Sequence, residues 1–220
     1  ENEIEVIKSM SVVREAVEDA GLYISYSIPG FHNRPIYKDN SPLKVVYGVD
    51  SVGNFSSDSL ANLWAPIKMR FTFDGNNPVK VVYECYLDRG DEEAVEYSTE
   101  FSDSVYVLAT PSGNILLEKM CSFDELEGEL QVVINPLTPT ARGYMSMLGV
   151  APVSKSSSVS MMAINTPVPA TGIDFLNAVI NSYNNVTNEE KRIVARQTEE
   201  FILERIDSLS QELVVMETRL

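Results

Sequence analysis

The sequence predicts an α+β fold, a small mixed α/β base with a long C-terminal helix and an inserted antiparallel β module. Three observations support this prediction. Apolar residues recur at helical spacing near both ends of the chain, in residues 3–20 and 166–220. The segment between them has no helical period and holds short β-rich runs separated by turn signals. We therefore expect a base domain of residues 1–30 and 130–220 and a β-rich insert of residues 31–129.

The first helix is predicted over residues 3–20. Its apolar stripe recurs at every third or fourth position and comprises Val6, Met10, Val13 and Val17. Ser11 is a candidate internal cap that restarts the helix after a bend at residues 9–11. Gly21 is expected to end the helix, because glycine is common just past a helix C-terminus. A strand with alternating apolar residues follows at residues 22–28.

The predicted insert consists of short strands joined by polar turns. The expected strands are residues 43–47, 67–73, 79–86, 105–109 and 115–117. A proline and glycine turn at residues 111–114 joins the last two, so we predict a hairpin between residues 105–110 and 115–119. Closely spaced strands of this kind are typical of a small antiparallel sandwich or barrel-like module.

After the insert, the chain is predicted to return to the base. A strand is expected at residues 130–134. Thr138 as a cap and Pro139 at the first helical position then predict a short helix. Two further strands are expected at residues 150–153 and 158–164, separated by a polar run.

The C-terminal third predicts a long helical segment that begins with a cap and proline at residues 166–167. A capping box at residues 187–190 predicts a bend or fresh helix start near residues 184–187. From Ile202 the apolar residues step by four and three positions, as in a coiled-coil heptad. The candidate oligomer or stalk contacts along this seam are Ile202, Ile206, Leu209, Leu213, Met216 and Leu220. An ordinary C-terminal helix packed on its own domain remains an alternative.

The composition is acidic and ordinary for a soluble globular protein. The chain has 220 residues, of which 44% are hydrophobic and 22% are charged, and its net charge is -15. The charge argues against binding to a nucleic-acid backbone or to an anionic membrane surface, since both need clustered lysine and arginine. The sequence contains no apolar run of the roughly 18–20 residues that a membrane-spanning helix requires.

Residue types that could carry catalysis are present but are not grouped in a catalytic pattern. His32 is the only histidine and lies in a turn without a nominated nucleophile or acid partner. An acidic cluster surrounds a glycine turn and is interpreted as a solvated loop; it comprises Asp88, Asp91, Glu92, Glu93 and Glu96. Cys85 is expected to be a buried free thiol, and a disulfide to Cys121 remains open. We predict no catalytic residue, metal site or cofactor in this chain.

Two blocks at the ends of the chain resemble a known family. The first is residues 2–9, Asn-Glu-Ile-Glu-Val-Ile-Lys-Ser, followed by the predicted helix. The second comprises residues 153–159, 167–170, 176–180, 183–184 and 195–205, the last reading Ala-Arg-Gln-Thr-Glu-Glu-Phe-Ile-Leu-Glu-Arg. They resemble the periplasmic domain of bacterial polysaccharide co-polymerases, the Wzz-type chain-length determinants. The match is closest to the capsular exopolysaccharide branch, in which this domain is fused to a cytoplasmic tyrosine autokinase.

The resemblance implies an inner-membrane protein with one membrane helix before Glu1 and another after the long helix and its return. It implies a ring-like homo-oligomer that works with a polysaccharide polymerase or export machinery. The function would be to set the length, or assist the export, of capsular polysaccharide, exopolysaccharide or O-antigen. The family has no periplasmic catalytic residues, and a kinase domain would lie outside these residues. Because helices of the family run on past the position of Leu220, we expect the helix tip to lie outside this chain.

Two functions of other classes remain open. The first is a periplasmic glycan-binding or adaptor module of an export system, with the acidic insert as its ligand site. The second is a hydrolase that uses paired carboxylates within residues 88–96 for glycoside chemistry.

Overall fold

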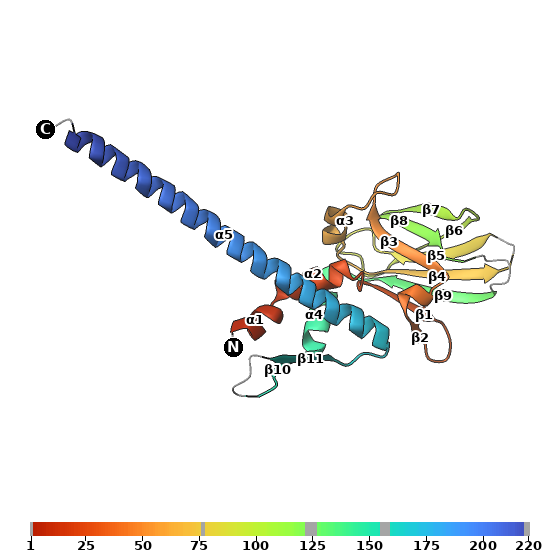
Figure 1. The fold of residues 1–220 in the computed structure, drawn as a ribbon. Coiled ribbons are helices and arrows are strands. Elements are labelled where there is room, and N and C mark those ends of the chain that lie inside the picture. The colour runs from red at the N-terminus through yellow and green to blue at the C-terminus, as the bar shows by residue number, and fades with distance from the viewer. Residues whose placement is uncertain (1, 76–77, 122–126, 155–158, 218–220) are drawn as a thin grey trace.

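The computed structural model has an α+β fold, as predicted, with antiparallel sheets, a helical base and one long C-terminal helix (Figure 1). It describes residues 2–75, 78–121, 127–154 and 159–217. The side chains of residues 2, 57, 58, 127 and 211–217 lie outside this description.

The N-terminal segment folds as two helices, α1 (Asn2–Ile7) and α2 (Met10–Asp19). The bend between them confirms the predicted interruption, but the residue that caps the second helix is Ser9. Its side chain accepts a hydrogen bond from the backbone N–H of Val12 at 3.4 Å. Ser11 lies inside α2, so its predicted role as the cap is wrong.

Gly21 ends the second helix, as predicted. Its φ of 65° lies in the left-handed region that glycine adopts without strain. The backbone N–H of Leu22 then donates to the carbonyl of Val17 at 2.9 Å, and that of Gly21 donates to Glu18 at 3.0 Å. This pair of bonds is a Schellman motif, which satisfies the last carbonyls of α2 and turns the chain into the first strand.

The larger sheet has six strands in the order β2-β1-β9-β4-β5-β6, and all neighbours are antiparallel. Its strands are β1 (Ile24–Ile28), β2 (Arg34–Ile36), β4 (Ile67–Asp74), β5 (Val79–Cys85), β6 (Val95–Phe101) and β9 (Glu127–Ile134). Strand β9 pairs with β1 on one side and with β4 on the other. The sheet therefore joins strands of the predicted base to strands of the predicted insert.

The smaller sheet has three strands in the order β3-β8-β7, namely β3 (Leu43–Val49), β7 (Val105–Thr110) and β8 (Gly113–Lys119). The predicted hairpin between β7 and β8 is confirmed. Its turn is held by the hydroxyl of Tyr47, which donates to the carbonyl of Ser112. Buried side chains of both sheets and of the base helices form one continuous core.

In the described part of residues 31–130, four elements were not predicted. They are the strands β2 and β6, the short 3-10 helix η1 (Lys38–Asn40) and the helix α3 (Ser57–Asn62). Helix α3 is too short to show a helical period. Strand β6 includes Glu96, which pairs with Glu84 of β5, so the interpretation of this residue as part of a solvated loop is wrong.

The base is completed by helix α4 (Leu137–Met147) and the hairpin of β10 (Leu148–Pro152) and β11 (Ser160–Ile164). Helix α4 begins one residue before the predicted cap at Thr138, with Pro136 in the capping position. The threonine that bonds at this end is Thr140, whose hydroxyl donates to the carbonyl of Pro136 at 2.8 Å.

Helix α5 runs without interruption over 49 residues (Pro169–Glu217). The predicted fresh start near residues 184–187 is wrong, because Thr187 lies in the middle of this helix. No glycine or proline occurs between Ile173 and Glu217, so each added residue can extend the helical hydrogen bonding at little cost. Val186, next to Thr187, also packs against the core, which stabilises the helix at the predicted break.

Candidate interaction surface on the C-terminal helix

The proximal part of α5 is an integral part of the base. Phe175 and Val179 are fully buried, and α5 packs along α2. The ring of Phe175 lies 4.8 Å from that of Tyr144 in α4, centroid to centroid. The side-chain amide of Asn185 adds a bond of 3.3 Å to the carboxylate of Glu15 in α2. These contacts fix the direction in which the helix leaves the body.

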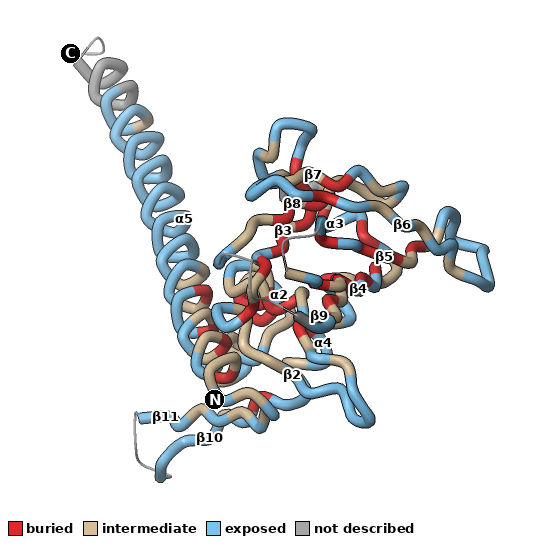
Figure 2. Tube along the Cα trace, turned by 90° about the vertical axis from the view of Figure 1, so that its right-hand side faces the viewer, coloured by how far each residue is buried: buried red, intermediate tan, exposed pale blue. Residues whose placement is uncertain are grey.

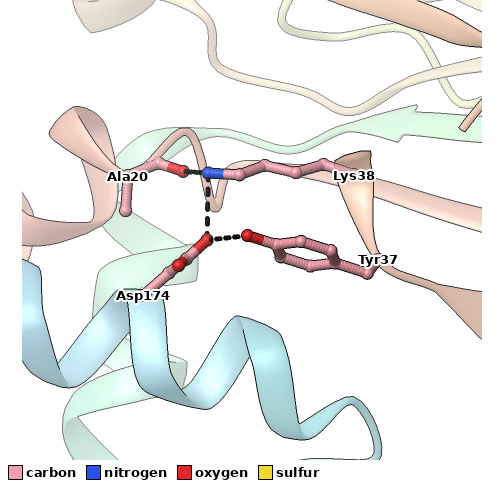
Figure 3. A network of polar contacts seen from close by, with 4 residues as sticks. All are labelled: Ala20, Tyr37, Lys38 and Asp174. Carbon is pink, nitrogen blue, oxygen red and sulfur yellow. Dashed lines mark hydrogen bonds and ion pairs between the residues drawn. The ribbon is translucent and has the colours of Figure 1, made fainter. Parts of the chain in front are cut away.

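A polar network strengthens this attachment (Figure 3). The Asp174 carboxylate of α5 accepts a hydrogen bond from the Tyr37 hydroxyl at 2.8 Å and lies 3.2 Å from Lys38 Nζ. The same ammonium group donates to the carbonyl of Ala20, the C-cap residue of α2, at 2.8 Å. A cation at a helix C-terminus is favourable because the helix dipole is negative there. The turn that carries Tyr37 and Lys38 therefore links the end of α2 to α5.

This network also changes the acidity of its phenol. The hydrogen bond to Asp174 is the main cause that raises the pKa of Tyr37 to about 12, because ionisation would place a phenolate beside a carboxylate. The Tyr37 hydroxyl therefore remains a hydrogen-bond donor to Asp174 throughout the neutral pH range.

The distal part of α5 has the opposite character. We use "distal helix" for residues 188–217. From residue 188 to residue 210 every side chain is exposed except that of Ser208, which is half-buried (Figure 2). At 1.5 Å per residue this segment is about 35 Å long. It extends away from the sheets and base helices, as the ribbon shows (Figure 1).

The predicted seam lies on this distal helix. Ile202 is 50% exposed, Ile206 is 55% exposed and Leu209 is 44% exposed. Leu213 and Met216 belong to α5, but their side chains lie outside the described residues, and Leu220 lies outside them entirely.

The seam faces away from the side of the helix that packs on the base. Ile202 follows the buried Phe175 by 27 residues, and Ile206 follows the buried Val179 by the same number. At 3.6 residues per turn, 27 residues make about seven and a half turns, so each pair lies on opposite sides of the helix. An extension of the intramolecular packing along α2 would therefore leave the seam uncovered. The alternative of a C-terminal helix packed on its own domain applies to the proximal part of α5 alone.

Other large apolar side chains on the distal helix were not included in the predicted seam. Ile193, Val194, Phe201 and Leu203 are all exposed, and Phe201 is 67% exposed. They do not follow the four-three spacing, so the heptad pattern alone does not identify them. What identifies them in the sequence is that residues 193–203 contain several large apolar side chains at positions other than those of the seam. Together with the seam they make an apolar surface wider than a two-helix coiled coil needs.

The remaining candidate residues do not assemble a catalytic site. His32 is exposed in the loop between β1 and β2, where its ring lies edge-on to Phe31. Cys85 is buried at the end of β5, Cys121 is exposed, and both are free thiols. Burial raises the pKa of the Cys85 thiol, which disfavours the reactive thiolate. Within the described residues, no group of three or more histidine, cysteine, aspartate or glutamate side chains could hold a metal ion.

Neither a protein-family model nor a curated protein matches this chain. Among the helices in the described part of the chain, none is both long enough and apolar enough to cross a membrane. The feature that most clearly needs a functional explanation is the exposed apolar surface of the distal helix.

Proposed function

We propose that this chain is the periplasmic part of an inner-membrane polysaccharide co-polymerase. It would act as an oligomeric scaffold that regulates the chain length or export of capsular polysaccharide, exopolysaccharide or O-antigen. The observation that carries the proposal is the distal helix, which extends from a well-packed body and exposes large apolar side chains on several sides. The resemblance of residues 2–9 and of the blocks within residues 153–205 to this family gives the proposal its biological setting.

Exposing the apolar side chains of the distal helix to water is energetically unfavourable, and this favours assembly. Seven large apolar side chains of the distal helix are exposed: Ile193, Val194, Phe201, Ile202, Leu203, Ile206 and Leu209. Contiguous exposed apolar surface of this kind usually marks an interaction site. Covering each side chain would contribute roughly 1.5–3 kcal/mol if burial were complete. A neighbouring helix, from another copy or from a returning segment of the same protein, would recover this free energy.

The shape of the subunit also suits a closed ring. A ring needs a heterologous interface, in which one face of a subunit meets a different face of the next. The distal helix exposes the seam on one side and Val194 and Phe201 on an adjacent side. Two adjoining apolar faces on one helix allow it to contact two neighbours at the same time.

The proposal can be tested by substituting the seam in the full-length protein and measuring the polysaccharide that the cell makes. Ile202→Asp combined with Ile206→Asp places two carboxylates on the seam. A matched variant, Arg196→Asp, lowers the net charge of the same helix by the same two units. Arg196 is exposed and lies about 120° around the helix from Ile202 and about 140° from Phe201. We expect the matched variant to give the wild-type length distribution on a polyacrylamide gel and the seam variant to give a broad, unregulated one.

A co-polymerase role would be excluded if the seam variant, present at the wild-type level in the inner membrane, produced the wild-type length distribution and amount of polysaccharide. Loss of regulation in both variants alike would also contradict the proposal, because the effect would then come from added charge and not from the seam.

A further inference from the structure

A cleft of about 590 Å³ lies between the end of α2 and strand β1 on one side and strand β3 on the other. Its lining comes from five segments that are far apart in the sequence: residues 18–26, 38–39, 44–46, Phe55 and Met120. One hydrogen bond spans its two sides, from the backbone N–H of Val45 in β3 to the hydroxyl of Tyr26 in β1, at 3.1 Å. The two sheets thus hold the shape of the cleft.

Aromatic and apolar side chains form part of this lining. Tyr23 and Tyr26 contribute from β1 and the turn before it, and both are buried. At the rim, Phe55 is 52% exposed and Met120 is also largely exposed. A cleft that combines apolar surface with a few polar groups is the usual form of a small-molecule site. An exposed aromatic ring at its rim offers a flat face for the C–H groups of a sugar ring.

The charged groups of the cleft favour a particular class of ligand. Three carboxylates and two ammonium groups line it, those of Glu18, Asp19, Asp39, Lys38 and Lys44. Both ammonium groups already have carboxylate partners elsewhere, since Lys38 lies 3.2 Å from Asp174 and Lys44 lies 3.4 Å from Glu118. The cleft therefore presents an excess of negative charge to a ligand, and carboxylates accept hydrogen bonds from hydroxyl and ammonium groups.

An extended peptide is a poorer occupant. A peptide could add to the outer edge of β3, which pairs only with β8 within its sheet. In the middle of that edge, however, the N–H of Val45 already donates to Tyr26. The ladder of backbone hydrogen bonds that strand addition needs is thus interrupted at its centre.

We propose that this cleft binds a neutral or amino-sugar-containing oligosaccharide and discriminates against acidic ones. The proposal rests on the proposed function for the source of the glycan, which would be the polysaccharide whose length the protein regulates. Tyr23, Tyr26 and Phe55 provide the apolar contacts. The carboxylates of Glu18, Asp19 and Asp39 accept hydrogen bonds from sugar hydroxyl and ammonium groups and repel uronic acids.

The test is calorimetric titration of this purified chain with three hexasaccharides of different charge. The probes are neutral chitohexaose, its cationic de-N-acetylated form, and acidic hexagalacturonate. We expect saturable binding of the first two and no measurable binding of the third. Phe55→Ala should weaken binding about five- to tenfold, the effect of losing one aromatic contact. The matched control is Val52→Ala, an exposed residue of the same loop that does not line the cleft and should leave binding unchanged.

Asp39→Asn tests the charge argument separately, because it keeps the size of the side chain and removes one negative charge. We expect it to weaken binding of the cationic hexasaccharide relative to the neutral one. Absence of saturable binding of both non-acidic probes, tighter binding of hexagalacturonate, or equal binding by Phe55→Ala and wild type would each overturn the proposal.

The same variants distinguish this proposal from the co-polymerase proposal. Light scattering of the full-length protein in detergent should show the same oligomer for Phe55→Ala and wild type. An intact oligomer without glycan binding would refute the cleft and leave the scaffold standing. Glycan binding by a strictly monomeric full-length protein would support the cleft and refute the scaffold.

Discussion

Phe71 in strand β4 and Phe201 in the distal helix are the same residue type in opposite surroundings. Phe71 is fully buried at the centre of the six-stranded sheet, whereas Phe201 is 67% exposed. The body buries its large apolar residues in its own core, where they stabilise the fold. The distal helix leaves its large apolar residues exposed to solvent. From this difference we predict that folding and association depend on separate parts of the chain.

The largest expected effect separates these two phenylalanines directly. Phe71→Ala should lower the free energy of unfolding by about 3–5 kcal/mol, because it leaves a cavity in a close-packed core. Phe201→Ala should change it by less than about 0.5 kcal/mol. Urea unfolding of this chain, followed by circular dichroism and tyrosine fluorescence, measures both. A comparable loss in the two variants would show that the distal helix is packed in the monomer.

The second effect concerns alkaline pH, which should act on the body and spare the distal helix. All ten tyrosines occur at or before Tyr183. Burial raises the pKa of Tyr26 to about 12, despite the lowering effect of the bond from Val45, and raises that of Tyr23 to about 12 as well. Since these pKa values exceed the unfolded value of about 10, the stabilisation is complete below pH 10 and is lost as the pH rises towards 12.

For Tyr26 alone this loss amounts to about 2–3 kcal/mol between pH 10 and pH 12. Urea unfolding at pH 8, 10, 11 and 12 measures it. Tyr26→Phe should be less stable at pH 8, where it lacks the acceptor for Val45, but should lose less stability above pH 10. A decline equally steep in the variant and the wild type would show that Tyr26 does not contribute to it.

The smallest effect tests the junction between the two regions. Asp174→Asn should lower the free energy of unfolding by about 1 kcal/mol, since it weakens the bonds to Tyr37 and Lys38 that hold α5 against the body. The control is Glu118→Gln, which breaks the more exposed pair with Lys44 and should cost less than about 0.5 kcal/mol. Equal effects would mean that the junction has no special role in stability.

Local patterns predicted most of the individual elements. The alternation of buried and exposed residues in β4 and the turn between β7 and β8 are encoded in consecutive residues, and both elements lie where the sequence places them. Strand β6 was not predicted, because Glu96 and Glu100 give it the composition of a solvated segment. Its pairing with β5 stabilises it as a strand despite these charges.

Sheet order was harder to predict than the elements, because it depends on contacts between distant residues. Nothing in the local sequence of β9 indicates that it pairs with both β1 and β4. For the same reason the cleft could not be predicted, because its lining comes from five separate segments.

The seam shows both the strength and the limit of sequence reasoning. The spacing of Ile202, Ile206 and Leu209 identified an apolar row that the structure leaves exposed. The direction in which the row faces could not be predicted, since the capping box at Thr187 suggested a break. Only an uninterrupted α5 relates Ile202 to Phe175 by a fixed number of turns.

The central claim is that the distal helix carries the association of subunits. Its most direct test is the mass of the full-length protein in detergent, measured by light scattering for wild type, for Ile202→Asp with Ile206→Asp, and for Arg196→Asp. We predict a defined oligomer for the wild type and the matched variant, and smaller species for the seam variant with unchanged unfolding of the body. A monomeric wild type, or an oligomer that survives in the seam variant, would contradict the claim.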